Sequence, residues 1–227
     1  MSTSVSVLVA VYDNARYVRA ALASALAQTR PADEIIVVDD GSHDDSAAIA
    51  EATPGVRTIR EVHRGVAPTR NIALTHARGD LIAWLDSDDL WTPDKLAVQV
   101  AYMEAHPEVG MTFTHQRLFF EPGVERPYWV REEMIGAESL VVGTCSMVAR
   151  ASLFASVGGF DPAKTPADDT DWIFRARSAG VQLATLPEAL LLRRVHATNI
   201  STTLPVGRSL VLGMLRDTIK RRRQAEP

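Results

Sequence analysis

The run Asp86-Ser87-Asp88-Asp89 is the part of this 227-residue sequence with the clearest capacity for chemistry. Two further acidic groups, Asp13 and Asp39-Asp40, also stand at the end of an apolar segment. If these segments are parallel strands, all three groups lie at one edge of a sheet, which is where α/β proteins bind ligands. Carboxylates gathered at one place repel one another unless a cation or a hydrogen-bond donor offsets their charge. The pattern therefore favours a site for a hard, oxygen-ligated cation such as Mg²⁺ or Mn²⁺.

The elements that must position these groups alternate between strand and helix. Continuous apolar segments rich in β-branched residues predict strands, and apolar residues that recur every three or four positions predict helices. The strands are expected at residues 4–11, 34–38, 57–62 and 81–85, and the helices between them at 15–28, 44–52 and 66–77. Because such repeats form open α/β sheets, we predict an α/β fold with a mostly parallel central sheet and flanking helices.

The remainder of the chain is less regular. Strand-like segments at 111–120 and 141–148 predict a small mixed or antiparallel extension of the sheet. Thr92-Pro93 is typical of a helix start, with a threonine cap followed by proline, and that helix should stop at His106-Pro107. Three further helices are expected at residues 151–157, 170–178 and 206–223.

We interpret the chain as a single domain with a terminal appendage. The domain covers residues 1–205, with a nucleotide-binding half at 1–108 and an acceptor and catalytic half at 109–205. Residues 206–227 are expected to form a helix with a basic tail. Such a tail is usually solvated, so we expect no contact with a membrane, although anionic lipid is the surface it would suit.

Composition and charge narrow the class of protein. The hydrophobic fraction of 46% and charged fraction of 23% are those of a globular protein, and the formal net charge of -4 gives no general attraction to nucleic acid. Cys145 is the only cysteine, which excludes an intramolecular disulfide and a multi-cysteine zinc site and fits a reducing cytoplasm. The apolar run at 5–11 is too short to span a bilayer and follows no basic residues, so secretion and membrane insertion are not expected.

The sequence lacks the usual glycine-rich phosphate loops. Residues 11–15, after the first strand, contain no glycine, and no loop ending in Gly-Lys-Ser or Gly-Lys-Thr occurs. Dehydrogenases, P-loop enzymes and nucleotidyltransferases are therefore disfavoured, and a metal ion becomes the expected route to a diphosphate. The alternative interpretation of Asp86 to Asp89 is a polar loop or a helix cap, but Thr92-Pro93 is expected to perform the capping.

Six segments of the chain resemble the family 2 glycosyltransferases, which have the GT-A fold. They are Ser6 to Asp13, Ile36 to Ser42, Arg70 to Ala73, Leu85 to Asp89, Gly158 to Asp161, and His196. Each is weak alone, but their order and spacing over roughly residues 4–201 are specific to this family. Ala10 stands where the family often has proline, Asp13 where it often has asparagine, and Asp168 where it usually has glutamate. These departures affect details of the site rather than the fold.

The resemblance implies a site for a nucleoside diphosphate sugar, with uridine as the commonest base. Tyr12 and Asp40 would contact the base, with the Asp40 carboxylate accepting a hydrogen bond from a uracil-type N–H, and Arg70 would lie near the diphosphate. An aromatic face, a carboxylate and a guanidinium suit these three tasks. Core packing of Tyr12 and a surface ion pair of Arg70 are the structural alternatives. The same site is expected to include Ala10, Asp13, Asp86 and Ser87.

The resemblance also implies the metal ligands. Asp86 and Asp88 match the two acids of the family's Asp-X-Asp motif, and Asp88 is the stronger candidate for direct ligation of Mg²⁺ or Mn²⁺. Asp89 would not bind the metal itself but would orient the residues that do. His196 matches a late histidine segment that can complete the metal shell or close over the diphosphate, and a structural histidine is the alternative.

An inverting transfer needs a base that takes the proton of an acceptor hydroxyl. Asp169 holds that position by resemblance, Asp168 and Asp171 are alternatives, and helix capping is the structural interpretation of the pair Asp168 and Asp169. Trp172 is a weaker candidate for stacking on the acceptor.

The expected activity is the transfer of a single sugar to a hydroxyl acceptor, which could be a glycan, a lipid-linked molecule or a small molecule. Synthesis of bacterial-type or cell-surface glycans would suit such an enzyme. A catalytically silent module that binds a nucleotide-sugar and acts with a partner is the alternative. The presence of both Asp86/Asp88 and Asp168/Asp169 favours catalysis.

Overall fold

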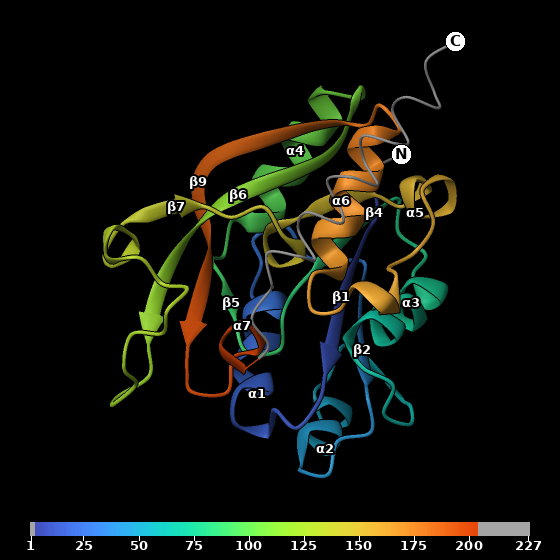
Figure 1. Cartoon of the computed structure of the whole chain (residues 1–227). Coiled ribbons are helices and arrows are strands. Elements are labelled where there is room, and N and C mark those ends of the chain that lie inside the picture. The colour runs from blue at the N-terminus through green and yellow to red at the C-terminus, as the bar shows by residue number, and fades with distance from the viewer. Residues whose placement is uncertain (1–2, 204–227) are drawn as a thin grey trace.

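The computed structural model describes residues 3–203, which form one α/β domain around a single mixed sheet (Figure 1). The strand order across the sheet is β3-β2-β1-β4-β8-β6-β9-β5, and β7 pairs with β6. Two layers of buried side chains cover the sheet. Helices α1, α2 and α4 pack on one face and helices α3, α5 and α6 on the other.

The first half of the chain forms the parallel part of the sheet. Its elements are β1 (Val5–Val11), α1 (Ala15–Leu26), β2 (Glu34–Asp39), α2 (Ser46–Glu51), β3 (Val56–Arg60), α3 (Val66–His76) and β4 (Leu81–Trp84). Strand β1 pairs in parallel with β2 and β4, and β2 with β3. Strand β1 is valine-rich because it is buried on both faces: Val7 and Val9 enter one core layer and Leu8 the other. The predicted repeats are confirmed here.

The second half forms the mixed extension. Its elements are β5 (Leu90–Trp91), α4 (Lys95–Ala105), β6 (Val109–Phe120), β7 (Glu138–Leu140), β8 (Val148–Arg150), α5 (Ser152–Ser156), α6 (Asp168–Ser178), β9 (Gln182–Val195) and α7 (Ile200–Thr203), with short 3₁₀ turns η1 (Glu132–Met134), η2 (Thr144–Ser146) and η3 (Pro162–Lys164). Strand β8 is antiparallel to both β4 and β6, while the long strands β6 and β9 run in parallel side by side (Figure 1). The predicted mixed extension is confirmed: the first four strands pair with one another in parallel, whereas the extension combines antiparallel pairs with the parallel pair of β6 and β9.

Two parts of the extension differ from the prediction. The expected strand at 141–148 is instead the turn η2 followed by β8, because the Ser146 hydroxyl donates hydrogen bonds to the carbonyls of Val141 and Gly143 and folds the chain back. Strand β9 was not predicted from the pattern. Pro187 and Glu188 interrupt its apolar alternation, at the place where its register with β6 shifts.

The predicted helix start at Thr92-Pro93 is wrong. Helix α4 begins at Lys95, after Asp94, and Thr92 belongs to the end of the β5 ladder, where its N–H donates to the Leu190 carbonyl at 3.0 Å. Its hydroxyl makes no hydrogen bond. The predicted helix at 206–223 and the basic tail lie outside the described residues.

Lys95, the first residue of α4, is buried and has no carboxylate partner among the described residues. Its ammonium donates to Gln99 Oε1 at 2.6 Å and lies 4.4 Å from the centre of the Trp91 ring. Burial lowers the pKa of Lys95 to about 7, whereas an unfolded lysine has a pKa near 10. Between these two values the unfolded chain therefore binds more protons than the folded chain.

A difference in bound protons makes stability depend on pH. We expect the free energy of unfolding of the wild type, relative to Lys95→Met, to rise by up to about 1.4 kcal/mol per pH unit between about pH 7 and pH 10. Below pH 7 both states are protonated, so the difference should be constant. Urea denaturation of both proteins from pH 6 to pH 9 measures this, and parallel stability profiles would contradict the assignment.

Candidate active site

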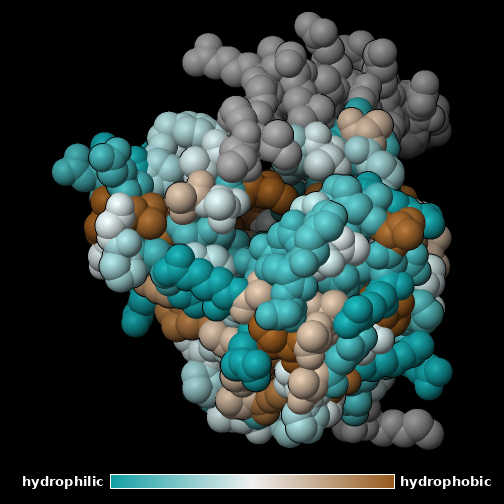
Figure 2. Space-filling model, turned by 90° about the horizontal axis from the view of Figure 1, so that it is seen from below, coloured by the Kyte–Doolittle hydropathy of each residue, from teal (hydrophilic) through white to brown (hydrophobic). Residues whose placement is uncertain are grey.

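Most of the residues singled out in the sequence line one cleft of about 600 Å³ at the carboxyl edge of the parallel strands. Figure 2 looks onto that edge and shows a hollow there. Of the predicted site residues the lining contains Ala10, Tyr12, Asp13, Asp40, Arg70, Asp86, Ser87, Asp88 and His196. Residues up to 186 positions apart in the sequence, from Ala10 to His196, thus meet at one place. Asp168 and Asp169 lie beside this lining rather than in it.

Asp88 and His196 face each other across the cleft. The His196 Nε2 atom lies 2.9 Å from Asp88 Oδ2, and Asn199 Nδ2 donates to the same oxygen at 3.2 Å. Asn199 Oδ1 in turn accepts the backbone N–H of His196 at 2.7 Å. The segment after β9 is therefore folded so that the buried imidazole of His196 meets the partly accessible carboxylate of Asp88 in the cleft lining.

Asp86 and Asp168 share Arg70. The Arg70 guanidinium donates to Asp168 Oδ2 at 2.8 Å and lies 3.5 Å from Asp86 Oδ1. Burial raises the pKa of Asp168, and the Arg70 charge opposes that rise. Because this guanidinium already has two carboxylates beside it, it neutralises the acidic cluster instead of standing free for another anion.

Asp89 has a structural task that the sequence did not predict. Its Oδ1 accepts the backbone N–H of Arg194 at 2.8 Å and so ties the acidic run to β9. Ligand atoms of Asp86, Asp89 and Cys145 also lie within 4.8 Å of one another. Burial raises the pKa of Asp89 and of the Cys145 thiol well above their ordinary values, so it disfavours the anionic form of both groups. Because a thiol must lose its proton to bind a metal, Cys145 is a poorer candidate for a metal ligand than the carboxylates.

The opposite end of the cleft carries the aromatic group. The Tyr12 ring is 40% exposed, and its centre lies 4.2 Å from that of His63. Asp40 is buried, and its carboxylate accepts the N–H groups of Arg64 and Gly65, both at 2.8 Å. Asp40 thus holds the turn after β3 in place, and any hydrogen bond to a base would be additional to these. Gly41 allows this close packing, because its φ is 74° and a Cβ there would lie 2.8 Å from the His63 nitrogen.

The loops around Tyr12 are fixed by polar contacts. Asp13, with a φ of 44°, accepts the His43 N–H at 2.7 Å, and the Ser87 hydroxyl accepts from Asn14 Nδ2 at 2.7 Å. Ala10 is half-buried at the end of β1. These contacts connect the loops after β1, β2 and β4, so the three predicted acidic groups share one rigid edge.

Helix α6 presents the acidic residues of its first turn. Asp168 is buried against Arg70, whereas Asp169 is half-buried, with Oδ1 accepting the Thr170 N–H at 2.6 Å and Oδ2 lying 3.4 Å from the Thr144 nitrogen. Asp171 is paired with Arg175 at 2.8 Å. The helix begins two residues earlier than predicted, after Ala167, and neither Asp168 nor Asp169 caps it.

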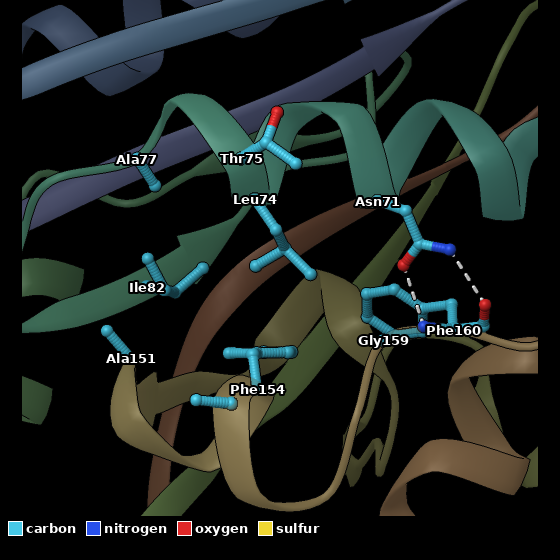
Figure 3. Close-up of a pocket in the computed structure, with 10 residues that line it drawn as sticks. Asn71, Leu74, Thr75, Ala77, Ile82, Ala151, Phe154, Gly159 and Phe160 are labelled. Atoms are coloured by element: carbon cyan, nitrogen blue, oxygen red, sulfur yellow. Dashed lines mark hydrogen bonds between the residues drawn. The ribbon is translucent and has the colours of Figure 1, made fainter.

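The turn before α6 is anchored to α3 by Asn71. Its side chain donates to the Phe160 carbonyl and accepts the Phe160 N–H, both at 2.8 Å, beside a mostly apolar pocket between α3 and α5 (Figure 3). A Cβ at Gly159 would lie 2.4 Å from Asn71 Oδ1, which explains the glycine. Because Asn71 follows Arg70, this pair of hydrogen bonds positions the start of α6 relative to the cleft.

The assignment of Trp172 to the acceptor is wrong. Trp172 is fully buried in the core, stacks on Phe154 with ring centres 4.4 Å apart, and donates its indole N–H to the Gly158 carbonyl. Its ring face is not available to a sugar.

The cleft residues that were missed in the sequence include three with polar side chains that matter below: His63, Arg193 and Asn199. His63 follows β3 and could have been found by the rule that ligand-binding residues come after strands, but the strand was expected to extend to residue 62. Arg193 and Asn199 flank His196, and β9 itself was not predicted.

Comparison with known proteins agrees with this geometry. The model of glycosyl transferase family 2 matches residues 6–147, which is more than half of the chain. The chain belongs to this family. Its fold is the GT-A fold.

Curated relatives of this family 2 chain include an uncharacterized glycosyltransferase of Rickettsia felis, which is 38% identical over 116 residues. That match covers 50% of the chain and 19% of the relative. An uncharacterized protein of Mycobacterium tuberculosis is 29% identical over 203 residues, covering 83% of the chain and 58% of that protein. The chain therefore spans only part of the length of these relatives.

Two solved structures show the fold. Staphylococcus aureus TarS, residues 1–349 in complex with UDP-GlcNAc, has a TM-score of 0.77 at 20% identity, covering 96% of the chain and 66% of TarS. The mannosyltransferase PcManGT of Pyrobaculum calidifontis, in complex with GDP-Man and Mn²⁺, has a TM-score of 0.70 at 24% identity, covering 88% of the chain and 59% of that protein. Within residues 3–203, no helix is long and apolar enough to cross a membrane.

Proposed function

We propose that this family 2 chain transfers a single sugar, with inversion, from a nucleoside diphosphate sugar to a hydroxyl acceptor. The observation that carries the proposal is the approach of His196 Nε2 to Asp88 Oδ2 at 2.9 Å, inside a cleft that also holds Asp86 and Tyr12. A uridine donor is the first to test. The similarity in fold to proteins solved with UDP-GlcNAc and with GDP-Man supports a nucleotide-sugar of either kind.

The residues of the cleft fit a divalent cation. Asp86 and Asp88 offer carboxylate oxygens, His196 offers an imidazole nitrogen, and Asn199 orients Asp88 from behind. When bound, Mg²⁺ or Mn²⁺ supplies positive charge that stabilises the departing diphosphate. Carboxylates suit both ions, but an imidazole nitrogen suits Mn²⁺ better, because Mg²⁺ takes oxygen ligands.

We therefore expect Mn²⁺ to support faster transfer than Mg²⁺, and His196→Gln to reduce that preference by about 10-fold, the lower range for disturbing a metal site. The ratio of transfer rates with the two ions measures this. His106→Gln, at the end of α4 and outside the cleft lining, is the control. An unchanged ratio in His196→Gln would show that His196 is not a ligand.

We assign the base to Asp169. Asp168 is buried and bound to Arg70, with its second oxygen also buried, and Asp171 is held by Arg175, so neither carboxylate is available to an acceptor. Among the described residues, the half-buried Asp169 has as hydrogen-bond donors the N–H of Thr144 and the N–H and hydroxyl of Thr170. Its carboxylate would take the hydroxyl proton as the acceptor oxygen bonds to the anomeric carbon and the bond to the diphosphate breaks.

The two ends of the cleft then have different tasks. Tyr12 presents an aromatic face for the base, and the carboxylates near β4 would hold the cation, which in turn would bind the diphosphate. The acceptor would approach from the side of η2 and α6, where Asp169 lies against Thr144.

The proposal is tested by incubating the chain with Mn²⁺, hydroxyl acceptors and a panel of nucleotide-sugars, and measuring release of the nucleoside diphosphate. We expect donor consumption with inversion at the anomeric carbon. Binding of a nucleotide-sugar without turnover, even with acceptor extracts supplied, would favour the silent binding module instead.

A further inference from the structure

Arg193, at the end of β9, is the arginine of the cleft lining without an ion pair in the part of the chain that the structure describes. The other basic side chains of the lining already contact carboxylates. Arg70 contacts Asp168 and Asp86, His63 lies 3.0 Å from Asp40 Oδ2, and His196 faces Asp88. This leaves one guanidinium whose charge no carboxylate offsets at contact distance.

Arg193 is held in place by the ring of Trp129, called here the aromatic shelf, and by Ser201. Its guanidinium lies 4.6 Å from the centre of the Trp129 ring, and Nη2 donates to Ser201 Oγ at 2.9 Å. Trp129 is itself fixed, because its indole N–H donates to Thr202 Oγ1 at 2.9 Å, and Tyr128 donates to the Ser201 carbonyl at 2.8 Å. The β6–β7 loop and α7 thus hold this side chain, and within residues 3–203 Ser201 is the one hydrogen-bond acceptor for its five N–H donors.

The surroundings of Arg193 are acidic. Burial opposes its protonation, but the neighbouring carboxylates of Asp89, Asp86 and Asp88 raise its pKa. The simplest interpretation is that Arg193 balances these carboxylates from a distance. A bound divalent cation, however, would neutralise these carboxylates in place of Arg193. The half-buried guanidinium would then carry an unpaired charge, and burying an unpaired charge costs free energy unless an anion binds beside it.

We propose that Arg193 binds the diphosphate of the sugar donor. This inference rests on the proposed function. Arg193, Asp88 and His196 line the same cleft, and Asp88 lies close enough to act on the charge of Arg193, so an anion bound to a cation at Asp88 and His196 would be within its reach. A guanidinium matches phosphate oxygens with two parallel hydrogen bonds. As the bond from the anomeric carbon to the diphosphate oxygen breaks, its electron pair stays on that oxygen, and Arg193 stabilises the added charge.

Trp129 is then a positioning residue. It touches no reacting atom, but its ring fixes the plane of the guanidinium and its N–H fixes α7. The β6–β7 loop on the acceptor side of the sheet would in this way set the affinity for the diphosphate. Trp129 and Arg193 are far apart in the sequence, and the pairing of β6 with β9 brings them into contact.

The test compares binding of nucleosides and nucleoside diphosphates by calorimetry with Mn²⁺ present. The probe is whichever of UDP, GDP and dTDP the wild type binds most tightly, together with its nucleoside. Arg193→Met is expected to weaken diphosphate binding about 10- to 100-fold, the scale of a charge-assisted hydrogen bond, without changing nucleoside binding. The diphosphate affinity of Arg193→Lys should lie between those of the wild type and Arg193→Met, because lysine keeps the positive charge but cannot form two parallel hydrogen bonds.

Control variants separate this role from folding. Arg131→Met removes an exposed arginine of the same loop, paired with Glu133, and should bind as the wild type does. Trp129→Phe keeps an aromatic shelf and should lose less diphosphate affinity than Trp129→Leu. Equal diphosphate binding by the wild type and by both Arg193 variants would overturn this inference alone. A wild type that binds none of the three diphosphates would overturn the proposed function as well.

Discussion

Replacing Asp88 with alanine is expected to abolish metal-dependent binding of the sugar donor while the fold is retained. Asp88 places its carboxylate between His196 and Asn199 and is partly accessible from the cleft. The substitution removes a ligand and also releases the imidazole opposite it. Because the cation is expected to supply several kcal/mol of charge stabilisation, transfer should fall by at least about 100-fold.

Mn²⁺ titration followed by electron paramagnetic resonance measures this change directly, with calorimetry of the nucleotide as a second readout. Asp45→Ala is the matched control, since Asp45 is exposed before α2 and its side chain caps nothing. Both variants should melt within a few degrees of the wild type. Unchanged Mn²⁺ affinity in Asp88→Ala would rule out the metal assignment, and attention would turn to Asp86, Asp89 and Cys145.

The acidic run that suggested a metal site is a single motif in the sequence, but in the structure its three aspartates have different tasks. Asp86 contacts Arg70, Asp88 meets His196, and Asp89 binds the backbone of β9. Thr92 was expected to cap the next helix and so to leave these acids without a structural task. In the described structure the Thr92 side chain caps no helix, and Asp89 does have a structural task. The conclusion for Asp88 stands on geometry instead.

The parts of the fold that could be predicted are those determined locally. Strand β1 and helix α1 follow from the apolar pattern of contiguous residues, and the position of the acidic groups after their strands follows from the parallel arrangement. Strand β9 could not be predicted in this way. Its polar residues, including Arg193, are accommodated by partners such as Trp129 and Ser201 that are remote in sequence or belong to the next turn.

Burial was the main source of error in the site. Trp172 and Asp169 are three residues apart on α6, yet the first is enclosed by Phe154 and the second is half-exposed near η2. A sequence contains both residue types without the packing that separates them. The same holds for Asp40: the resemblance gave its carboxylate a hydrogen bond to the base, and in the structure it accepts two backbone N–H groups from the turn after β3.

Asp169→Asn is expected to preserve binding of Mn²⁺ and of the sugar donor and to slow transfer by at least about 100-fold, the usual contribution of a general base. The amide keeps the size of the side chain and its contact with Thr170, but it cannot take a proton. Asp168→Asn should act differently. It removes the charge that faces Arg70 at 2.8 Å, so we expect lower stability and weaker donor binding before any specific loss of the chemical step.

Single-turnover measurements with saturating donor and Mn²⁺ separate these outcomes, because they report the chemical step without the contribution of binding. Asp169→Glu, which restores a carboxylate on a longer side chain, should recover part of the rate. If instead Asp168→Asn binds the donor normally and loses transfer while Asp169→Asn stays active, the roles of the two residues must be exchanged. Arg70 would then be the group that holds the base, and the ion pair at 2.8 Å would have to open when the acceptor binds.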